Sequence, residues 1–487
     1  MVTTFPAVRA WNARRPMYDR TTADGPATNP EQDVPMETFV IEGGRRLTGR
    51  VRVNGSKNAA LPLAATVLLT DDEVTLRGVP ELADLKNMYR LLCELGCDRL
   101  SEPPAGEAGT IKFRADPKGN SHARYDIVKT MRASICTLGP MLARRGYARV
   151  SMPGGCSIGD RPVDLHVRGM QALGAEITLD GGDIIAKAPA GGLRGSTMFL
   201  GGAFGSTVLG TANVMSAATL AKGVTIIESA ACEPEIVDLA NMLNAMGARV
   251  RGAGSPRVII EGVKELSGTD YTVMPDRIEA GTFILAAAIT NGDVVVENCP
   301  IDSLLCVIDK LAAMGIHVTP VPSAPGVPAG IDPLRACVRV TCDRTIKPVE
   351  VTTQPHPGFP TDLQAQLMAT LTLADGNSVI TERIFPERFL HVAELSRMGA
   401  KLYRQGPTVI ISGVKKLIGA PVMASDLRAS ACLVMAGLAA EGTTIIHRVY
   451  HLDRGYERME DRLKGLGASI QRIDDKDLPK SSQLSEG

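Results

Sequence analysis

The stretch "AKGVTIIESAACEPEIVDLANMLNAMGA", residues 221–248, decides the fold. It begins with a glycine-led run rich in β-branched residues, which is typical of a strand. A short connector follows, and then a segment whose apolar residues recur at helical spacing. The segment closes on Met246 and Gly247, and a glycine in that place is a common helix stop. The stretch therefore predicts one strand followed by one amphipathic helix.

Five other stretches repeat this pattern. The six copies close on Gly96, Gly174, Gly247, Gly315, Gly399 and Gly467. A second helical segment, almost uncharged after its first turn, precedes each copy, and such segments are typical of buried helices. The copies therefore predict an α/β fold of globular units, with helices inside and sheets outside. A period of about 70 residues is too long for the usual solenoid repeats.

The composition excludes several classes of function. Lys and Arg number 53, as do Asp and Glu, and this zero net charge argues against a nucleic-acid or anionic-membrane partner. The apolar runs are too short for membrane insertion and the chain starts without a secretion signal, so we expect a cytoplasmic protein. The ten cysteines form no CxxC pair and the seven histidines no HExxH pattern, so we expect no metal. Neither a P-loop nor a GxGxxG motif occurs, so we expect no cofactor.

Both ends of the chain differ from the repeats. Residues 1–35 are rich in Pro, Thr and Arg and show no periodicity, so we expect a disordered extension there. Folding should begin near Met36. Residues 475–487 form a polar tail that we expect to be frayed.

Polar residues gather at the first turns of the buried helices. They are Lys57, Asn58, Arg132, Thr207, Asp276, Arg277, Asp362, Asp426 and Arg428. Capping accounts for the aspartates and the threonine, but a cation at a helix N-terminus opposes the helix dipole. A bound phosphate or carboxylate would resolve that conflict, because the free N–H groups of a helix start attract anions. The pattern therefore predicts anion binding near these helix ends.

Several motifs in a fixed order carry a family resemblance. They are "NGSKNAALP", "MRASICTLGP", "PGGCSIGDRPVDLH", "EPEIVD", "PDRIEAGTF", "HPGFPTDLQAQ", "FPERFLHVAEL", "SDLRAS" and "YHLDRGYERMED". With them the chain resembles, over about residues 36–474, the UDP-N-acetylglucosamine enolpyruvyl transferases of the EPSP synthase superfamily. The resemblance implies two inside-out α/β domains of three βαβαββ units each. One domain would be 57–274 and the other 36–56 plus 275–474.

The resemblance also implies a reaction. Members of the family transfer the enolpyruvyl group of phosphoenolpyruvate to the 3-hydroxyl of UDP-N-acetylglucosamine and release phosphate. This step commits the sugar nucleotide to peptidoglycan synthesis, and so serves cell shape and cell division. The family needs no metal for this chemistry. The two substrates are the partners that we expect, and the oligomeric state stays open.

The resemblance assigns roles residue by residue. Cys156 would donate a proton and be alkylated by the drug fosfomycin, while Asp362 would act on the sugar hydroxyl and Lys57 would assist. The phosphoenolpyruvate ligands would be Lys57, Asn58, Arg161, Arg388, Arg428 and Arg454. The sugar-nucleotide ligands would be Arg132, Arg161, Pro162, Val163, Asp164, Leu165, Gly205, Ser206, Thr207, Val208, Asp362 and Ile384.

Alternatives remain for single residues and for the whole chain. Asp362 could be only a first-turn acid, and a surface salt bridge is the normal fate of an arginine such as Arg454. Thr207-Val208-Leu209 stands where Ser-Val-Gly is usual in the family, and the lost glycine would crowd the diphosphate. The sister transferase of the shikimate pathway shares the fold, but the "PGGCSIGDRPVDLH" loop argues against it. A catalytically silent paralogue that binds sugar nucleotide would not need the cysteine, the acid and the cations together.

Overall fold

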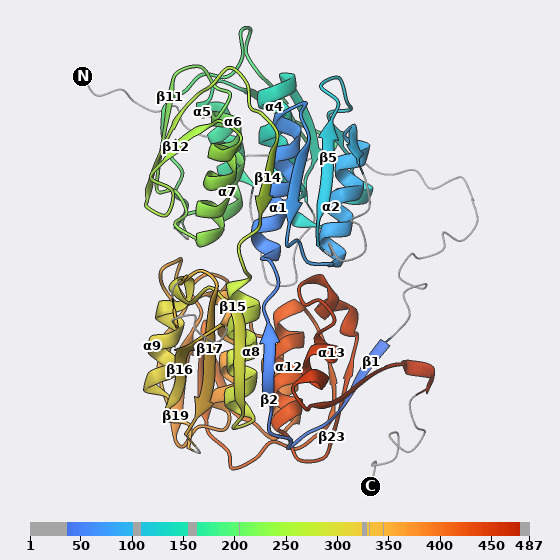
Figure 1. Cartoon of the computed structure of the whole chain (residues 1–487), viewed down its shortest axis with the longest axis vertical. Helices are drawn as coiled ribbons and strands as arrows, with labels where there is room; N and C mark the ends of the chain where they lie inside the picture. Colours follow the sequence, from blue (N-terminus) through green and yellow to red (C-terminus); the bar gives the residue numbers. More distant parts are fainter. Residues whose placement is uncertain are drawn as a thin grey trace, which may run out of the picture. The chain divides into compact units, whose positions relative to one another are not determined.

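The computed structural model describes residues 37–100, 109–153, 163–203, 205–323, 329–330, 332–343 and 345–477. Six four-stranded sheets lie within them, one for each predicted copy of the repeat (Figure 1). These residues belong to one unit, Met36–Gly487, and Met1–Pro35 is a separate unit. The predicted extension at 1–35 and the part of the predicted tail beyond Asp477 lie outside the described residues. Asp475–Asp477 form a short 3₁₀ helix, η7.

The stretch at 221–248 forms the centre of one sheet unit. Its strand and helix are β11 (Val224–Glu228) and α7 (Pro234–Ala245), as the sequence predicts. The whole unit runs β10 (Thr197–Phe199), α6 (Val208–Ala218), β11, α7, β12 (Arg249–Arg251) and β13 (Arg257–Glu261). The sheet order is β10-β11-β13-β12, in which β10 and β11 are parallel and the other neighbours antiparallel. This is a βαβαββ unit.

Three other units follow the same plan. One holds β6 (His122–Ala123), α3 (Tyr125–Val128), η3 (Arg132–Thr137), α4 (Leu138–Arg145), β7 (Tyr147–Ser151), α5 (Asp164–Ala172), β8 (Glu176–Asp180) and β9 (Asp183–Lys187). Another holds β18 (Glu350–Thr352), η5 (Thr361–Leu363), α10 (Gln364–Leu371), β19 (Asn377–Thr381), α11 (His391–Arg397), β20 (Lys401–Gln405) and β21 (Thr408–Ser412). The third holds β22 (Pro421–Met423), α12 (Leu427–Ala439), β23 (Thr443–His447), η6 (Val449–Arg454), α13 (Met459–Gly465) and β24 (Ser469–Asp474), with β1 (Glu37–Glu42) as its remaining strand.

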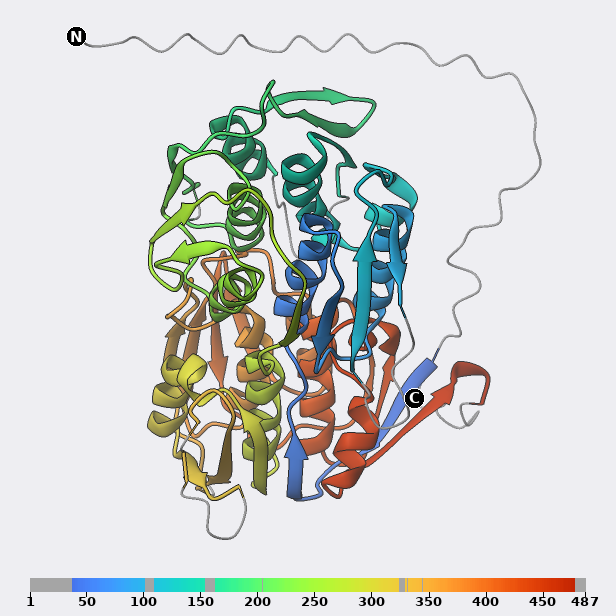
Figure 2. The ribbon, with the colours of Figure 1, turned by 45° about the horizontal axis from the view of Figure 1, so that its top comes forward.

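The last two units exchange their first strands. β2 (Thr48–Arg52) continues into α1 (Lys57–Ala65), yet it pairs with β15 (Asp293–Cys299). β14 (Thr269–Thr272) continues into α8 (Arg277–Ile289), yet it pairs with β3 (Val74–Arg77). The other elements of these units are η2 (Thr66–Leu69), α2 (Ala83–Glu94), β4 (Cys97–Arg99) and β5 (Ile111–Ala115), and η4 (Ile301–Leu304), α9 (Leu305–Ala313), β16 (Ile316–Val321) and β17 (Ala336–Cys342). Figures 1 and 2 both show β2 beside the yellow-green α8, and β14 among the blue elements.

The two segments that cross between these units run side by side. Gly55 and Pro275 form a bridge, and Ser56 N donates to Met274 O at 2.7 Å. A Cβ on Gly55 would lie 1.9 Å from the carbonyl oxygen of Gly78, so this crossing has room only for glycine. As a result, the first residues of α1 and α8 are neighbours.

Buried apolar side chains form two cores. The first core spans residues 59–274, and the second combines 39–53 with 278–470. We call the parts of the chain built on them the first half and the second half. Every residue of α8 and nearly every residue of α6 and α12 is buried. The predicted α/β fold with its helices inside is confirmed, and the two domain boundaries stay a prediction. In the part of the chain that the structure describes, no helix has the length and apolar character that a membrane crossing requires.

The six glycines that close the repeats share a left-handed backbone. Their φ angles are 83° at Gly96, 92° at Gly174, 100° at Gly247, 83° at Gly315, 89° at Gly399 and 93° at Gly467. Such a residue commonly ends a helix, and glycine adopts it without the steric penalty of a Cβ. At Gly247 no neighbouring atom lies within 4 Å of the Cβ position, so a side chain there meets strain only in the backbone.

Gly247→Ala should therefore lower the free energy of unfolding by about 1–2 kcal/mol. Gly465→Ala is the matched control, because Gly465 ends α13 and also has no atom within 4 Å of its Cβ position, but its φ is not positive. Alanine should be neutral or stabilising there. Scanning calorimetry of both variants gives the comparison. A Gly247→Ala protein with the melting temperature of the wild type would contradict the strain argument.

Candidate active site

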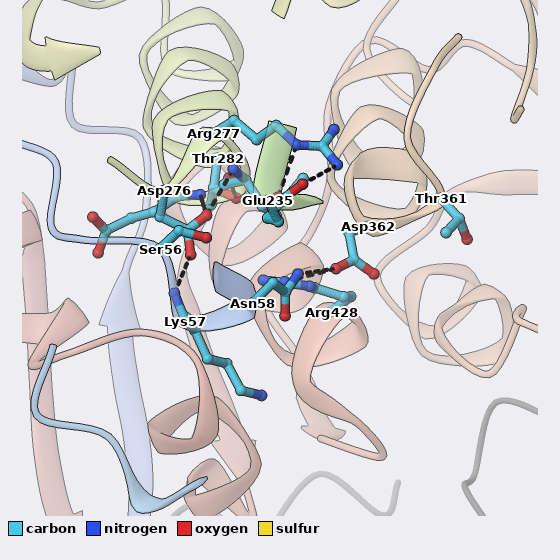
Figure 3. Close-up of polar contacts among 12 residues, drawn as sticks. Ser56, Lys57, Asn58, Glu235, Asp276, Arg277, Thr282, Thr361, Asp362 and Arg428 are labelled. Carbon is cyan, nitrogen blue, oxygen red and sulfur yellow. Dashed lines mark hydrogen bonds and ion pairs between the residues drawn. The ribbon is translucent and has the colours of Figure 1, made fainter. Parts of the chain in front are cut away.

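Helix α1 begins at the crossing with its first N–H groups bound to side-chain oxygens. Ser56 is its N-cap. Asp276, the N-cap of α8, accepts from Lys57 N at 3.2 Å and from two N–H groups of its own helix at 2.8 and 3.0 Å. Figure 3 shows Ser56, Lys57 and Asp276 together. One carboxylate thus binds the starts of two helices that belong to different halves.

The Lys57 side chain leaves this cap toward α2. Its Nζ lies 2.7 Å from Asp84 Oδ2, and the two side chains are only 11% and 6% exposed. Arg454, the last residue of η6, donates from Nε to Asp84 Oδ1 at 3.0 Å. A carboxylate of the first half therefore binds one cation from each half.

Burial and charge act in opposite directions on this cluster. Burial lowers the pKa of Lys57, Asp84 raises it, and the charges of Arg428 and Arg454 lower it again, so that it stays below its ordinary value. Burial raises the pKa of Asp84, but Lys57 and Arg454 outweigh burial and the net shift is downward. Asp84 is therefore ionised near neutral pH and favours the charged form of Lys57.

Asp362 in η5 forms a second charged centre. Arg388 Nη1 donates to its Oδ1 at 2.7 Å, and Arg428 Nη2 donates to its Oδ2 at 2.8 Å. Asn58 of the first half also reaches Oδ2, at 3.4 Å from its Nδ2 (Figure 3). Burial raises the pKa of Asp362, but the guanidiniums of Arg428 and Arg388 outweigh it and hold the pKa well below its usual range. The carboxylate is therefore a constant acceptor near neutral pH.

A buried polar network fixes the orientation of Arg428. Its Nη1 donates to the hydroxyl of Tyr456, a residue that is 1% exposed, at 3.1 Å. The same hydroxyl lies 2.9 Å from Thr282 Oγ1 and accepts from Gln366 Nε2 at 3.1 Å. Gln366 also donates to the backbone oxygen of Asp362 at 3.0 Å. The network therefore joins Arg428 and Asp362 by a second route through α8 and α10.

The cation at the start of α8 has a separate partner. Arg277 donates to both oxygens of Glu235 in α7, at 3.0 and 3.2 Å, and the two side chains are 9% and 4% exposed. Figure 3 shows this pair beside the crossing. Lys57, Arg277 and Arg428 thus each contact a carboxylate of the chain itself, and the binding of a phosphate or carboxylate ligand near them stays a prediction.

The predicted sugar-nucleotide residues of the first half lie on neighbouring elements. Gly205, Ser206 and Thr207 precede α6, and Val208 begins it. Val163, Asp164 and Leu165 start α5. Leu165 Cδ1 lies 3.2 Å from the Cβ position of Gly202, which forms a bridge with Gly205. Arg132 begins η3, and burial together with its charge lowers the pKa of His166 in α5 to about 3. These segments therefore form one region.

The Thr207-Val208-Leu209 departure has a local explanation. Thr207 caps α6 by accepting from Gly210 N at 3.2 Å. A Cβ on Gly210 would lie 2.4 Å from Thr207 Cγ2, so this cap requires a glycine one position later than in the usual pattern. Leu209 is partly buried and packs against the first core, and its effect on the diphosphate stays a prediction.

A buried acid, Glu382, links Ile384 to the segment that carries Asp362. Glu382 is fully buried and accepts from Ile384 N at 2.8 Å and from Thr361 Oγ1 at 2.9 Å. Thr361 precedes Asp362 and accepts from Arg388 Nη1 at 3.1 Å. Glu382 therefore ties the backbone of Ile384 to the segment that carries Asp362.

Three predicted residues are not placed and one important residue was missed. Cys156, Arg161 and Pro162 lie outside the described residues. The sequence did not point to Asp84, because an acid in the first turn of a helix such as α2 is ordinary. Within the described ranges, no group of three or more His, Cys, Asp or Glu residues could hold a metal ion.

Comparisons with known proteins agree on the type of enzyme that this chain resembles. The family described as EPSP synthase (3-phosphoshikimate 1-carboxyvinyltransferase) matches residues 41–463. Two relatives are named UDP-N-acetylglucosamine 1-carboxyvinyltransferase. The one from Anaeromyxobacter sp. (strain Fw109-5) is 52% identical over 90% of this chain and 99% of its own length. The one from Methylacidiphilum infernorum (isolate V4) is 49% identical over 90% of this chain and 99% of its own length.

Solved structures share the fold at lower identity. The enolpyruvyl transferase NikO from Streptomyces tendae superposes with a TM-score of 0.78 at 23% identity, covering 90% of this chain and 99% of its own. EPSP synthase from Acinetobacter baumannii gives a TM-score of 0.67 at 20% identity, covering 90% of this chain and 100% of its own. At these identities the likeness supports the fold alone.

The charge cluster at Asp362 predicts a specific dependence of stability on pH. Asp362→Asn should cost about 3–5 kcal/mol at neutral pH, because two buried guanidiniums lose their carboxylate. Since folding lowers the pKa of Asp362, its stabilisation is complete above the unfolded value of about 3.9 and disappears as the pH falls through the folded value. Melting temperatures of the variant and the wild type should therefore converge as the pH falls below about 4.

Asp270→Asn is the control for this prediction. Asp270 also binds an arginine, Arg77, through two bonds of 2.8 Å, but the two side chains are 53% and 40% exposed. Solvent screens such a pair, which is worth about 0–1 kcal/mol. Equal losses of stability in the two variants would show that burial does not strengthen the Asp362 cluster.

Proposed function

The chain belongs to the EPSP synthase family, and on that basis we propose that it transfers the enolpyruvyl group of phosphoenolpyruvate to the 3-hydroxyl of UDP-N-acetylglucosamine. The observation that carries the proposal is the cluster of four cations around two carboxylates. Lys57, Arg388, Arg428 and Arg454 come from both halves and contact Asp84 or Asp362. A place in peptidoglycan synthesis in the cytoplasm, and hence a role in cell shape and division, is part of the proposal.

The four cations suit phosphoenolpyruvate, which carries a phosphate and a carboxylate. Arginine binds such planar or tetrahedral oxyanions with two parallel bonds, and lysine binds them as a point charge. Arg388 and Arg428 are 6% and 4% exposed, so their positions are set before substrate arrives. Fixed positive charge of this kind stabilises negative charge that grows on the substrate during reaction. Asn58 and Arg161 complete the proposed set of ligands.

Asp362 is proposed to orient the sugar hydroxyl. A carboxylate whose pKa lies well below its usual range is a weak base, so it does not remove the proton in advance. It can still accept the hydrogen bond of the 3-hydroxyl and direct the oxygen lone pair toward C2 of phosphoenolpyruvate. The proton then leaves as the new C–O bond forms and the hydroxyl becomes acidic.

The reaction balances in two steps. In the first, the sugar oxygen bonds to C2 as the C2–C3 double bond opens, a proton from the Cys156 thiol adds to C3 and leaves a thiolate, and the hydroxyl proton passes to water. In the second, phosphate leaves C2 and the Cys156 thiolate takes back a proton from C3, which restores both the thiol and the double bond of the enolpyruvyl ether. The cations hold the phosphate while the C–O bond to it breaks.

The sugar nucleotide is proposed to lie where the two halves meet. Its first-half ligands would be Arg132, Arg161, Pro162, Val163, Asp164, Leu165, Gly205, Ser206, Thr207 and Val208. The second half would contribute Asp362 and Ile384, which Glu382 and Thr361 hold in one segment. In this arrangement the sugar contacts Asp362. Asn58 Nδ2 of the first half lies 3.4 Å from the Asp362 carboxylate, so ligands of the first half are near it.

Phosphate release tests the proposed reaction. We expect turnover with phosphoenolpyruvate and UDP-N-acetylglucosamine, and none when shikimate 3-phosphate replaces the sugar nucleotide. Lys57→Ala should reduce turnover about 100-fold, the loss typical when one donor to a developing anion is removed. Lys86→Ala is the control, because Lys86 forms an exposed pair with Glu81. Turnover with shikimate 3-phosphate alone would assign the sister reaction, and no turnover with either acceptor would indicate a silent paralogue.

A second test concerns the proposed proton donor. Fosfomycin should alkylate Cys156 and spare the other cysteines, because a thiol reacts as the thiolate. Burial raises the pKa of eight other thiols, those of Cys93, Cys97, Cys136, Cys232, Cys299, Cys306, Cys342 and Cys432. Peptide mass spectrometry of the treated protein locates the adduct. An adduct on one of those eight, with Cys156 unmodified, would remove Cys156 from the mechanism.

A further inference from the structure

Asp84 contacts two of the proposed substrate-binding cations at once. It lies in the first turn of α2 and is 4% exposed, and Arg454 reaches both of its oxygens, the more distant one from Nη2 at 3.5 Å. Oδ2 lies 2.7 Å from Lys57 Nζ, and Oδ1 accepts from Arg454 Nε at 3.0 Å. The cations belong to α1 of the first half and η6 of the second half. Their side chains therefore converge on one buried carboxylate.

We propose that Asp84 is a positioning residue, which keeps the Lys57 side chain charged and aims it, together with Arg454, at the anion of the substrate. The inference rests on the proposed function, because it gives those two cations their purpose. Asp84 need not touch substrate to act in this way. Its role differs from that of an ordinary ion pair, which would only tie the two halves together.

The surroundings of Lys57 explain why it needs such a partner. An ammonium loses hydration when it is buried, and the nearby Arg428 and Arg454 repel it. Asp276 is also close, but it accepts from the backbone N of Lys57 and from the start of α8. Asp84 is thus the acid bound to the ammonium itself.

The acids and cations on the other elements around α1 are already engaged. On α7, Glu235 pairs with Arg277, and Asp238 accepts from Tyr271 Oη at 2.7 Å. On η3, Arg132 lies beside His166 of α5, whose pKa burial and the Arg132 charge lower. None of these side chains substitutes for Asp84 within the described part of the chain.

The first experiment is the pH dependence of phosphate release by Asp84→Asn. Without the carboxylate Lys57 should lose its proton at lower pH, so the alkaline limb of kcat/KM for phosphoenolpyruvate should move down by about 1–3 pH units. Asp84→Glu keeps the charge and should restore the limb toward that of the wild type. Glu81→Gln is the matched control, because Glu81 precedes α2 and binds Lys86 with 72% of its side chain exposed. Its profile should equal that of the wild type.

The second experiment does not need turnover. Trace acetic anhydride reacts only with uncharged amines, so labelling of the Lys57 peptide as a function of pH gives the midpoint of its titration. Asp84→Asn should move that midpoint down. Arg454→Gln removes a repelling charge on a side chain that is 43% exposed, and it should move the midpoint up. The second variant keeps the test decisive if Asp84→Asn does not fold.

The experiments separate a failure of the proposed reaction from a failure of the proposed role of Asp84. A wild-type protein that releases no phosphate would overturn the proposed reaction, whatever the labelling shows. A wild type that turns over, with the same alkaline limb and the same Lys57 midpoint in Asp84→Asn, would overturn the role of Asp84 alone. A Lys57 midpoint that is unchanged in both Asp84→Asn and Arg454→Gln would also overturn the role of Asp84.

Discussion

The arrangement of the site depends on the pairing of four cations, three of them buried, with carboxylates of the same chain. Like charges repel strongly in a region of low dielectric, and a desolvated cation without a partner is costly. Asp84 separates Lys57 from Arg454, and Asp362 separates Arg388 from Arg428. Each carboxylate fixes its two cations in place, so the cluster is formed before any substrate is present.

The exchange of first strands brings these pairs together. Because β2 continues into α1 and β14 into α8, two helices that belong to different halves start at one crossing. Helix starts carry unpaired N–H groups and a positive partial charge, which favours anions. The crossing thus places two such starts side by side, and Asp276 binds both. Charged residues of the two halves can therefore lie close together there without a long connecting loop.

The sequence predicts those features of this fold that have a local cause. Gly247 and its five counterparts follow from helix ends that need a left-handed residue, and the buried helices follow from uncharged segments. The conflict between the cations and the helix dipole predicts a bound phosphate or carboxylate near Lys57 and Arg428, and this stays a prediction. The pairing of Arg428 with Asp362 and of Arg454 with Asp84 could not be predicted, because the partners are 66 and 370 positions apart and no periodicity links them. The family resemblance predicts a role in the reaction for Asp362, whereas the local pattern alone predicts only a helix cap.

The same electrostatics limit what Asp362 can do in the reaction. A site that binds a multiply charged anion needs excess positive charge, and positive charge lowers the pKa of any carboxylate within it. Strong binding of phosphoenolpyruvate and strong general-base catalysis by Asp362 are therefore incompatible in this cluster. A carboxylate that only orients the hydroxyl does not meet this conflict, since its ionised form is both the better hydrogen-bond acceptor and the form that Arg388 and Arg428 stabilise. In the proposed reaction the acid that protonates C3 is therefore a different group, outside the direct contacts of these arginines, so that it still holds a proton at neutral pH.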